Sequence, residues 1–410
     1  MTFWPAVLIL LGVYYATVIS LFAVGLRRAL HPSLAGGTEP DHTNRHRNAA
    51  RALPFVSVVI PARNEESTIA ACLESVLACN YPPERFEVIV VDDGSTDDTP
   101  AEVSRVRKAH YRVPVSPSGE PVVEETPHRP GLLLLTMRQR PNGTGFGKRS
   151  ALEEGIRHAR GSLIMLTDAD CTVAPDWIQA ISRCFRGDTG FVSGPVLYNT
   201  ERRTWFEMQA LEFLGLIAVG AGAIGLGRPI LCNGANMAFR KETYMLLGGF
   251  GHSSVNSAGE EELLMHVVAS SERWSVRFCG DPAAAVTTDP APTLGSFLHQ
   301  RSRWASLSLR LPQRLILVPL LALFYFFVLL IAGTVAAPFF PALWAAVALV
   351  WGLKAAAEFA VLYPACRHFK QSHLLRHFVA AQILHPPYIV YCSLAGLLGR
   401  FRWKERTARP

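Results

Sequence analysis

The sequence has no paired cysteines. Its eight cysteines are scattered along the chain, and none of them forms the C-x-x-C pair that is typical of zinc sites. We therefore expect no zinc site. Most of the cysteines fall in the parts that we expect in the cytoplasm or the membrane, which favours reduced thiols.

The sequence also has no internal repeat and no basic arm. Its formal net charge is +7, but the lysines and arginines lie mostly beside apolar segments near the two ends. No face of the central region is visibly basic. We therefore expect a bilayer as a partner and no nucleic acid.

Charge is missing from a long run near the N-terminus. Residues Phe3–Leu26 are apolar and uncharged, which is about the ~20 residues that a membrane span needs. Arg27 and Arg28 follow at once. A cleavable signal peptide carries its charge before the apolar core, so we favour a transmembrane anchor over residues 1–28, followed by a polar linker over 29–53.

Two more apolar segments lie near the C-terminus, at Leu315–Ala337 and Pro341–Tyr363. Only Lys354 and Glu358 interrupt the second. These two residues are four apart, so they share one helix face and are predicted to pair.

The last apolar segment, Phe378–Leu398, contains His385, Pro386 and Pro387 in its middle. Two prolines at this place indicate a broken helix or a re-entrant hairpin rather than a plain crossing. Residues 311–400 are therefore expected to form transmembrane or re-entrant segments, before a basic tail over 401–410.

Positive charge flanks these segments on one side and predicts the topology. Because positive loops stay in the cytoplasm, we expect an integral protein of the plasma (inner) membrane with its N-terminus outside and its central region in the cytoplasm. The basic tail also favours the cytoplasmic side, and hence a re-entrant last segment. The flanking residues are Arg27, Arg28, Arg45, Arg47, Arg51, Arg310, Arg314, Arg367, Lys370 and Arg376.

From Pro54 onward, β-branched runs alternate with helical patterns. "FVSVVIPARNEE" and "FEVIVVDDGSTDDT" read as strands that end in polar loops, and "STIAACLESVLAC" between them reads as a helix. This alternation predicts an α/β fold with a mostly parallel sheet and helices on both faces. Ligands of such sheets bind at the carboxyl ends of the strands.

Polar clusters stand at three of these strand ends. In "MLTDADC" a buried strand runs directly into Asp168 and Asp170. Such a pair can cap the next helix, or it can hold Mg²⁺ or Mn²⁺, which carboxylates and substrate phosphates bind together. The other two clusters are Asn64 with Glu65, and Asp92 with Asp93. Three separate caps are a poor explanation for three such clusters, so we favour a ligand site.

Seven motifs in order carry a family resemblance: "VSVVIPARNEE", "VIVVDDGSTDDT", "GKRSALEEGI", "LTDADC", "GANMAFRK", "GEEELL" and "QRSRW". The chain resembles the family 2 glycosyltransferases over residues 54–310. It is most similar to the membrane-anchored branch of cellulose, hyaluronan and poly-N-acetylglucosamine synthases and their smaller lipid-directed relatives. The resemblance implies a GT-A domain, a nucleotide-diphosphate sugar as donor and inversion at the anomeric carbon.

The resemblance also implies roles for residues at the strand ends. Asp168 and Asp170 would form the D-x-D pair that binds Mg²⁺ or Mn²⁺, with Asp170 the more direct ligand. A cation there would stabilise the leaving diphosphate. The remaining nucleotide-sugar contacts would come from Pro61, Glu65, Asp92, Asp93 and Lys148. An Asx-turn in "DDGSTDD" is compatible with this interpretation, and the resemblance favours UDP over GDP.

The motif "GEEEL" supplies the proposed catalytic base. The alignment of Gly259 with the family pattern implies Glu261 as the base, and Glu260 is the second candidate. The family usually has Asp at this place, so the longer Glu is a departure. The alternative interpretation is an acidic helix start, which the helix dipole favours.

Two further motifs complete the expected site. "QRSRW" matches the Q-x-x-R-W signature, in which Arg303 would contact the diphosphate, Trp304 the acceptor sugar, and Gln300 the donor region. An amphipathic interface helix is the alternative. Gly234 and Asn236 of "CNGANMAFRK" would lie on the acceptor side. The apolar stretch 211–230 is long enough for a fourth span, but its many glycines favour an interfacial helix, and a crossing would separate the D-x-D pair from Glu261.

These observations together predict an inverting glycosyltransferase that acts on a lipid or glycan acceptor at the membrane. We favour transfer to a membrane-embedded or lipid-linked acceptor, because three or four spans are few for a polymer channel. A processive synthase of an exported polysaccharide is the alternative. A catalytically inactive scaffold that binds nucleotide sugar is the alternative from another class.

Overall fold

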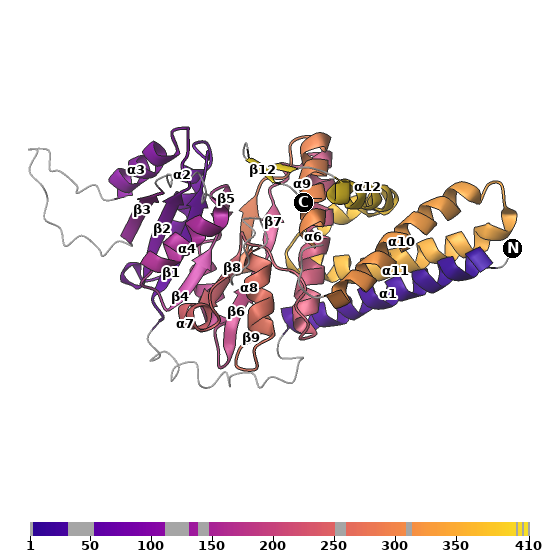
Figure 1. The fold of residues 1–410 in the computed structure, drawn as a ribbon, viewed down its shortest axis with the longest axis horizontal. Helices are drawn as coiled ribbons and strands as arrows, with labels where there is room; N and C mark the ends of the chain where they lie inside the picture. Colours follow the sequence, from indigo (N-terminus) through magenta and orange to yellow (C-terminus); the bar gives the residue numbers. More distant parts are fainter. Residues whose placement is uncertain are drawn as a thin grey trace, which may run out of the picture. The chain divides into compact units, whose positions relative to one another are not determined.

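The computed structural model describes most of the chain, in two compact units. The sheet unit consists of Ala29–Leu197 and Gly227–Thr288, and the helical unit of Met1–Arg28, Tyr198–Leu226 and Asp289–Pro410 (Figure 1). The predicted linker over 29–53 lies almost wholly outside the described residues. The described residues are 3–31, 53–110, 131–137, 147–250, 260–308, 314–398, 401–403 and 406–408.

A mixed, mostly parallel sheet forms the sheet unit. Its strand order is β3-β2-β1-β4-β8-β6-β9. The first four strands are parallel, β8 is antiparallel to both its neighbours, and β9 is parallel to β6. The strands are β1 Val56–Ala62, β2 Phe86–Asp92, β3 Gly131–Thr136, β4 Leu163–Leu166, β6 Thr189–Ser193, β8 Met237–Arg240 and β9 Ser275–Phe278. This sheet confirms the predicted α/β class.

A smaller sheet and several helices accompany the main sheet in the described part of this unit. The small sheet has the order β5-β10-β7, from Cys171–Val173, Val286–Thr288 and Val196–Tyr198. The helices are α2 Ile69–Leu77, α3 Thr99–His110, α4 Lys148–His158, α5 Trp177–Arg183, α7 Lys241–Leu246 and α8 Glu260–Ala269.

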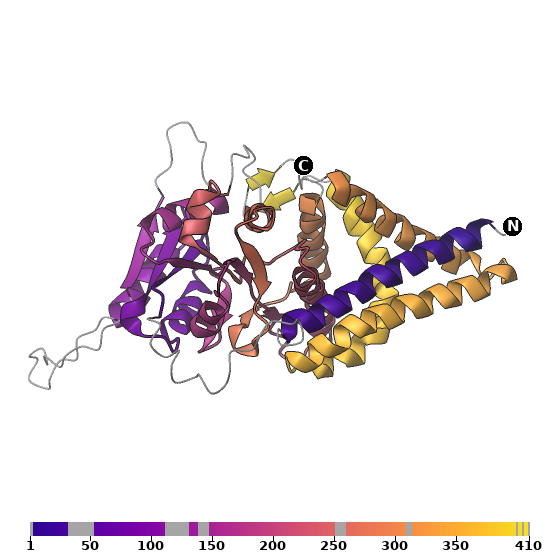
Figure 2. The same ribbon diagram turned by 90° about the horizontal axis from the view of Figure 1, so that it is seen from below.

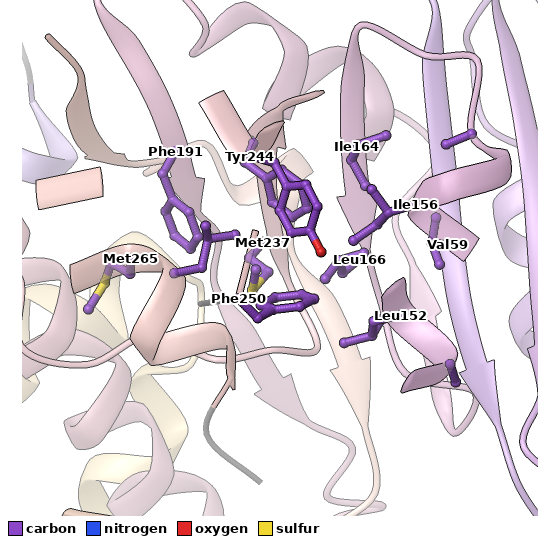
Figure 3. Packing of buried hydrophobic residues seen from close by; sticks show 14 of the residues in the cluster. Val59, Leu152, Ile156, Ile164, Leu166, Phe191, Met237, Tyr244, Phe250 and Met265 are labelled. Atoms are coloured by element: carbon purple, nitrogen blue, oxygen red, sulfur yellow. The ribbon is translucent and has the colours of Figure 1, made fainter. Parts of the chain in front are cut away.

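One buried core cluster of the sheet unit joins the main sheet to the helices α4 and α8. Val59 of β1, Leu152 of α4 and Phe191 of β6 belong to one buried cluster (Figure 3). Helix α4 approaches β1 so closely that a Cβ atom on Gly155 would lie 2.4 Å from Val59 Cγ1. The glycine in the middle of "ALEEGI" therefore allows α4 to lie flat on the strands that carry the polar clusters.

The helical unit contains the apolar segments. Figure 2 shows α1 beside the long helices α10 and α11, where Tyr15, Phe326 and Val350 share one buried cluster. Among the described residues, four helices are long and apolar enough to cross a membrane: Trp4–Leu30, Thr204–Gly225, Pro341–His368 and Ser372–Leu398. The helices of this unit are α1 Phe3–Leu30, α6 Thr204–Gly225, α9 Leu294–Ser308, α10 Arg314–Ala336, α11 Trp344–His368 and α12 Phe378–Leu398.

The last apolar segment corrects one prediction. Phe378–Leu398 forms a single helix, α12, with Pro386 and Pro387 inside it, so it is neither broken nor a hairpin within itself. Each proline removes only one backbone N–H, which frees the carbonyls four residues earlier, at Gln382 and Ile383. Packing of α12 against α9 and α10 holds the helix together through the prolines.

The two charges of the third apolar segment pair as predicted. Lys354 is fully buried and its Nζ lies 3.0 Å from the Glu358 carboxylate. Tyr15 of α1 donates to Glu358 and Gln382 of α12 accepts from Lys354, at 2.5 and 2.8 Å. One polar cluster thus joins three helices, as buried ionisable groups in apolar helices generally do.

Helices α1 and α6 cross at glycines, which leads to a first prediction. A Cβ atom on Gly222 of α6 would lie 2.3 Å from the carbonyl oxygen of Phe22, whereas one on Gly352 of α11 would meet nothing within 4 Å. We expect Gly222→Ala to destabilise the helical unit by about 1–3 kcal/mol through overpacking. The matched control Gly352→Ala should leave the thermal midpoint in detergent unchanged or raised. Equal midpoints for the two variants would contradict this account of the crossing.

Candidate functional site

Three neighbouring strands of the main sheet end in the predicted polar clusters. In the order β2-β1-β4, the strands are parallel, with Ala62 opposite Asp92 and Val59 opposite Leu166. The three following loops therefore leave the same edge of the sheet. Pro61, one of the predicted donor contacts, is the sixth residue of β1 and pairs with Val91.

The loops after β1 and β2 are joined by hydrogen bonds. Asn64 adopts a left-handed conformation, with φ of 53°, and its side-chain oxygen accepts from the Thr96 backbone N–H at 2.9 Å. Its own backbone N–H donates to Ser95 Oγ at 3.0 Å. The backbone N–H of Glu65 donates to Thr99 Oγ1 at 2.7 Å. The loops after the first two strands thus form one hydrogen-bonded platform.

The carboxylates of this platform have different surroundings. Asp92 is buried, and its Oδ1 accepts from the Ser95 backbone N–H, three residues on, at 3.0 Å. The Asx-turn of "DDGSTDD" is at Asp97, whose Oδ1 accepts from the Thr99 backbone N–H at 3.1 Å. Asp93 is buried beside Arg63, whose guanidinium lies 3.8 Å from its carboxylate. The half-buried Glu65 accepts from Thr68 Oγ1 at 3.1 Å.

Lys148 joins the third strand end to helix α4. It is the first residue of α4, and its Nζ lies 2.7 Å from Oδ1 of Asp168. Asp170 remains accessible to solvent, yet partial desolvation by the surrounding protein, together with the charges of Asp168 and Glu65, raises its pKa to about 6. The structure therefore brings Glu65, Lys148, Asp168 and Asp170 into one electrostatic cluster.

The turn of the D-x-D motif is fixed by residues that sequence reasoning missed. Cys171 donates its backbone N–H to the Asp168 carbonyl at 3.2 Å and its thiol to Asp170 Oδ1 at 3.4 Å. The thiol of the buried Cys72, in α2, contacts the same Asp168 carbonyl at 3.5 Å. Thr288 of β10 contacts the Asp170 carbonyl at 3.5 Å. Cys171 was adjacent to the motif, but the other two carry no local signal.

The donor set of this cluster fits a hard divalent cation. Desolvation raises the pKa of Asp170 most, and the charges of Asp168 and Glu65 raise it further; a bound cation would offset this like-charge part. No group of three or more His, Cys, Asp or Glu side chains suited to a metal occurs among the residues that the structure describes. Proteins usually supply only one or two carboxylate ligands to Mg²⁺, and water and phosphate oxygens occupy its other coordination positions.

The loop before β8 contains the two residues predicted for the acceptor side. Gly234 lies in its turn. Asn236 is fully buried: its Nδ2 donates to the carbonyls of Pro195 and Ala284 at 2.7 and 2.8 Å, and its Oδ1 accepts from Trp177 Nε1 at 3.0 Å. The Asn236 side chain therefore joins three segments of the sheet unit instead of facing solvent.

The acidic triplet opens α8. Glu260 is the first residue of the helix, as the alternative interpretation of an acidic helix start expected. The side chains of Glu260 and Glu261 lie outside the described part of the structure. Leu264, Met265 and Val268 of α8 are buried in the core below the sheet.

The residues of the Q-x-x-R-W signature belong to the helical unit, on α9. Gln300 accepts from Arg301 Nη1 at 2.6 Å, and the Trp304 ring lies under the Arg301 guanidinium, with Cζ 4.3 Å from its centroid. Arg303 is half-buried on the same helix. Helix α9 packs against α12 within this unit, with Phe297, Arg301 and Ser302 buried and Leu294 exposed.

The chain is similar to known proteins. Residues 54–306 match the model of the "Glycosyltransferase like family 2" family. The β-monoglucosyldiacylglycerol synthase of Nostoc is 25% identical over 70% of this chain and 56% of its own length. An N-acetylglucosaminyltransferase of Rhizobium meliloti is 28% identical over 63% of this chain and 57% of its own. The chain thus spans little more than half the length of these relatives.

A similar fold occurs in a solved structure. It is a mannosyltransferase of Pyrobaculum calidifontis in complex with GDP-Man and Mn²⁺, with a TM-score of 0.53, 20% identity, and coverage of 96% of this chain and 99% of that one. At this identity the likeness shows the GT-A fold alone. The family model, which covers more than half of the chain, shows more: this protein belongs to the glycosyltransferase family 2.

Proposed function

We propose that the chain is an inverting glycosyltransferase that moves a sugar from a nucleotide diphosphate, UDP in our interpretation, to a membrane-embedded or lipid-linked acceptor. The observation that carries this proposal is the cluster of Lys148, Asp168 and Asp170 beside Glu65, at the ends of neighbouring parallel strands. A cation-binding carboxylate pair next to a lysine is suited to a diphosphate.

Each side chain of the cluster has a role in this proposal. Asp168 and Asp170 would hold Mg²⁺ or Mn²⁺, which when bound neutralises charge on the leaving diphosphate. Lys148, now paired with Asp168, would meet the same phosphates as a point charge. Glu65 and Asp93 would contact the ribose and the base, and Asp92 would keep the turn between them in shape.

The catalytic base would come from the first turn of α8. The alignment of Gly259 with the family pattern favours Glu261 as the base and leaves Glu260 as the second candidate. A carboxylate there would take the proton of the acceptor hydroxyl as it attacks, and a single displacement inverts the anomeric carbon.

The acceptor is proposed from the helices and the relatives. Four described helices can cross a membrane by length and composition. Relatives are named for lipid acceptors: β-monoglucosyldiacylglycerol synthase, and an undecaprenyl-phosphate 4-deoxy-4-formamido-L-arabinose transferase of Edwardsiella ictaluri, 28% identical over 41% of this chain and 44% of its own length. We therefore propose an inner-membrane protein whose sheet unit works on the cytoplasmic side.

Lys148 provides a second prediction. We expect Lys148→Met to lower kcat/KM for the nucleotide sugar about 10²-fold, because one donor to the developing charge is lost. Arg157→Met, on the exposed part of the same helix, removes a surface pair with Glu154 and should change the rate little. Steady-state kinetics with one labelled donor measures both. Similar rates for the two variants would contradict the role of Lys148.

A donor screen tests the proposed activity itself. Purified full-length protein in detergent would be given a series of radiolabelled UDP- and GDP-sugars with Mn²⁺, with and without EDTA. Release of nucleotide diphosphate from at least one donor, abolished by EDTA, is the expected result. The absence of turnover with every donor, combined with retained nucleotide binding, would favour the scaffold alternative.

A further inference from the structure

Arg301 occupies the first variable position of the Q-x-x-R-W signature in "QRSRW". Its charged side chain is nevertheless buried within the helical unit. It is 4% exposed. Its Nη2 lies 2.5 Å from Glu212 Oε2, and its Nε lies 3.2 Å from both carboxylate oxygens. Tyr388 of α12 donates to the remaining side of Glu212, at 2.7 Å from Oε1. The positive charge of Arg301 is thus paired with the Glu212 carboxylate, which Tyr388 also holds by a hydrogen bond.

The same guanidinium contacts two residues of the signature. Its Nη1 donates to Gln300 Oε1 at 2.6 Å, and its flat face lies 4.3 Å above the Trp304 ring. The rings of Phe213 and Phe297 lie within 5.8 and 4.7 Å of its Cζ. A planar, bidentate and stacking cation is required for all of these contacts at once, and lysine offers only a point charge.

Other contacts already fix the backbone of α9. Gln209 of α6 exchanges two hydrogen bonds with Ala291, just before the helix, at 2.9 and 3.1 Å. Further along, a Cβ atom on Gly396 of α12 would lie 3.0 Å from the Ser302 carbonyl. These contacts hold α9 against α6 and α12 beside the Arg301–Glu212 ion pair, so a change at Arg301 leaves them in place.

We propose that Arg301, held by Glu212 and Tyr388, is a positioning residue that sets the side chains of Gln300 and Trp304 for sugar transfer. This inference rests on the proposed function, because the roles of Gln300 as a donor contact and Trp304 as an acceptor contact come from the resemblance to the same glycosyltransferase family. Nothing in the signature assigns a role to position 301, and the two helices that supply Glu212 and Tyr388 lie far from it in the sequence.

A double-mutant cycle tests this role. Arg301→Lys, Gln300→Ala and the double variant would be compared by kcat with saturating donor. If Arg301 acts through Gln300, each single change lowers kcat about 10- to 100-fold, and the double variant is scarcely worse than the poorer single one. A purely structural role would lower the thermal midpoint and give additive losses in kcat. Tyr388→Phe, which removes one hydroxyl, repeats the cycle in case Arg301→Lys does not fold.

Arg105→Lys is the matched control, because it changes an exposed arginine that pairs with Glu102 at 2.8 Å. Its combination with Gln300→Ala should be additive. Additive losses for Arg301→Lys in an active protein would overturn the positioning role alone. A wild-type protein without turnover would instead remove the proposed function, so the two failures can be told apart.

Discussion

Replacement of Asp170 by asparagine is expected to lower sugar transfer about 10³-fold, because the amide removes the charge that binds the cation at the diphosphate. The carboxylate lies beside Asp168 and Glu65 at the end of β4, and the Cys171 thiol and backbone fix its turn. The measurement is transfer from labelled donor over a range of Mn²⁺ concentrations. We expect excess Mn²⁺ to restore little activity.

Asp176→Asn is the matched control for this loss. Asp176 lies six residues further along and accepts from Asn80 at the surface, at 3.0 Å. Its amide variant should keep wild-type activity and the same Mn²⁺ dependence. If Asp170→Asn retained most of the activity while Asp168→Asn did not, the result would contradict Asp170 as the more direct ligand of the divalent cation.

Glu261→Gln is expected to lower kcat by about 10²- to 10⁴-fold, which is the usual contribution of a general base. Nucleotide binding should be unchanged, because the proposed donor contacts follow the strands β1, β2 and β4 and do not belong to α8. Isothermal titration with the nucleotide diphosphate and Mn²⁺, beside the turnover assay, separates these two effects.

Glu260→Gln is the internal control for the base. It removes the same charge from the same helix end, so a general dipole effect would appear equally in both variants. A large loss in Glu260→Gln with normal turnover in Glu261→Gln would transfer the role of base to Glu260. Normal turnover in both variants would contradict a base in this turn.

Much of the sheet unit could be predicted because its strands are continuous β-branched runs. "VSVVI" and "VIVV" became buried parallel strands, and polar residues directly after them marked the edge where Glu65, Asp92 and Asp168 gather. The direction of β8 could not be predicted, since an antiparallel strand within a parallel sheet depends on the path of the chain and not on local pattern.

Three features could not be predicted from the sequence, because each depends on contacts between segments that are far apart along the chain. The prolines of α12 predicted a break, but packing against α9 and α10 keeps the helix continuous. Asn236 looked like an acceptor contact, and only the fold shows that its amide is enclosed by Trp177, Pro195 and Ala284. The partner of Arg301 lies 89 residues away, on α6.

The most direct test of the central claim is the fate of the labelled sugar. Purified protein would be incubated with the donor found in the screen, Mn²⁺ and a lipid extract from the source cells, and the products separated by organic extraction and gel filtration. We predict label in the organic phase, as a glycolipid that carries one sugar in β-linkage. Label in a large water-soluble product would contradict transfer to a lipid and identify a polysaccharide synthase instead.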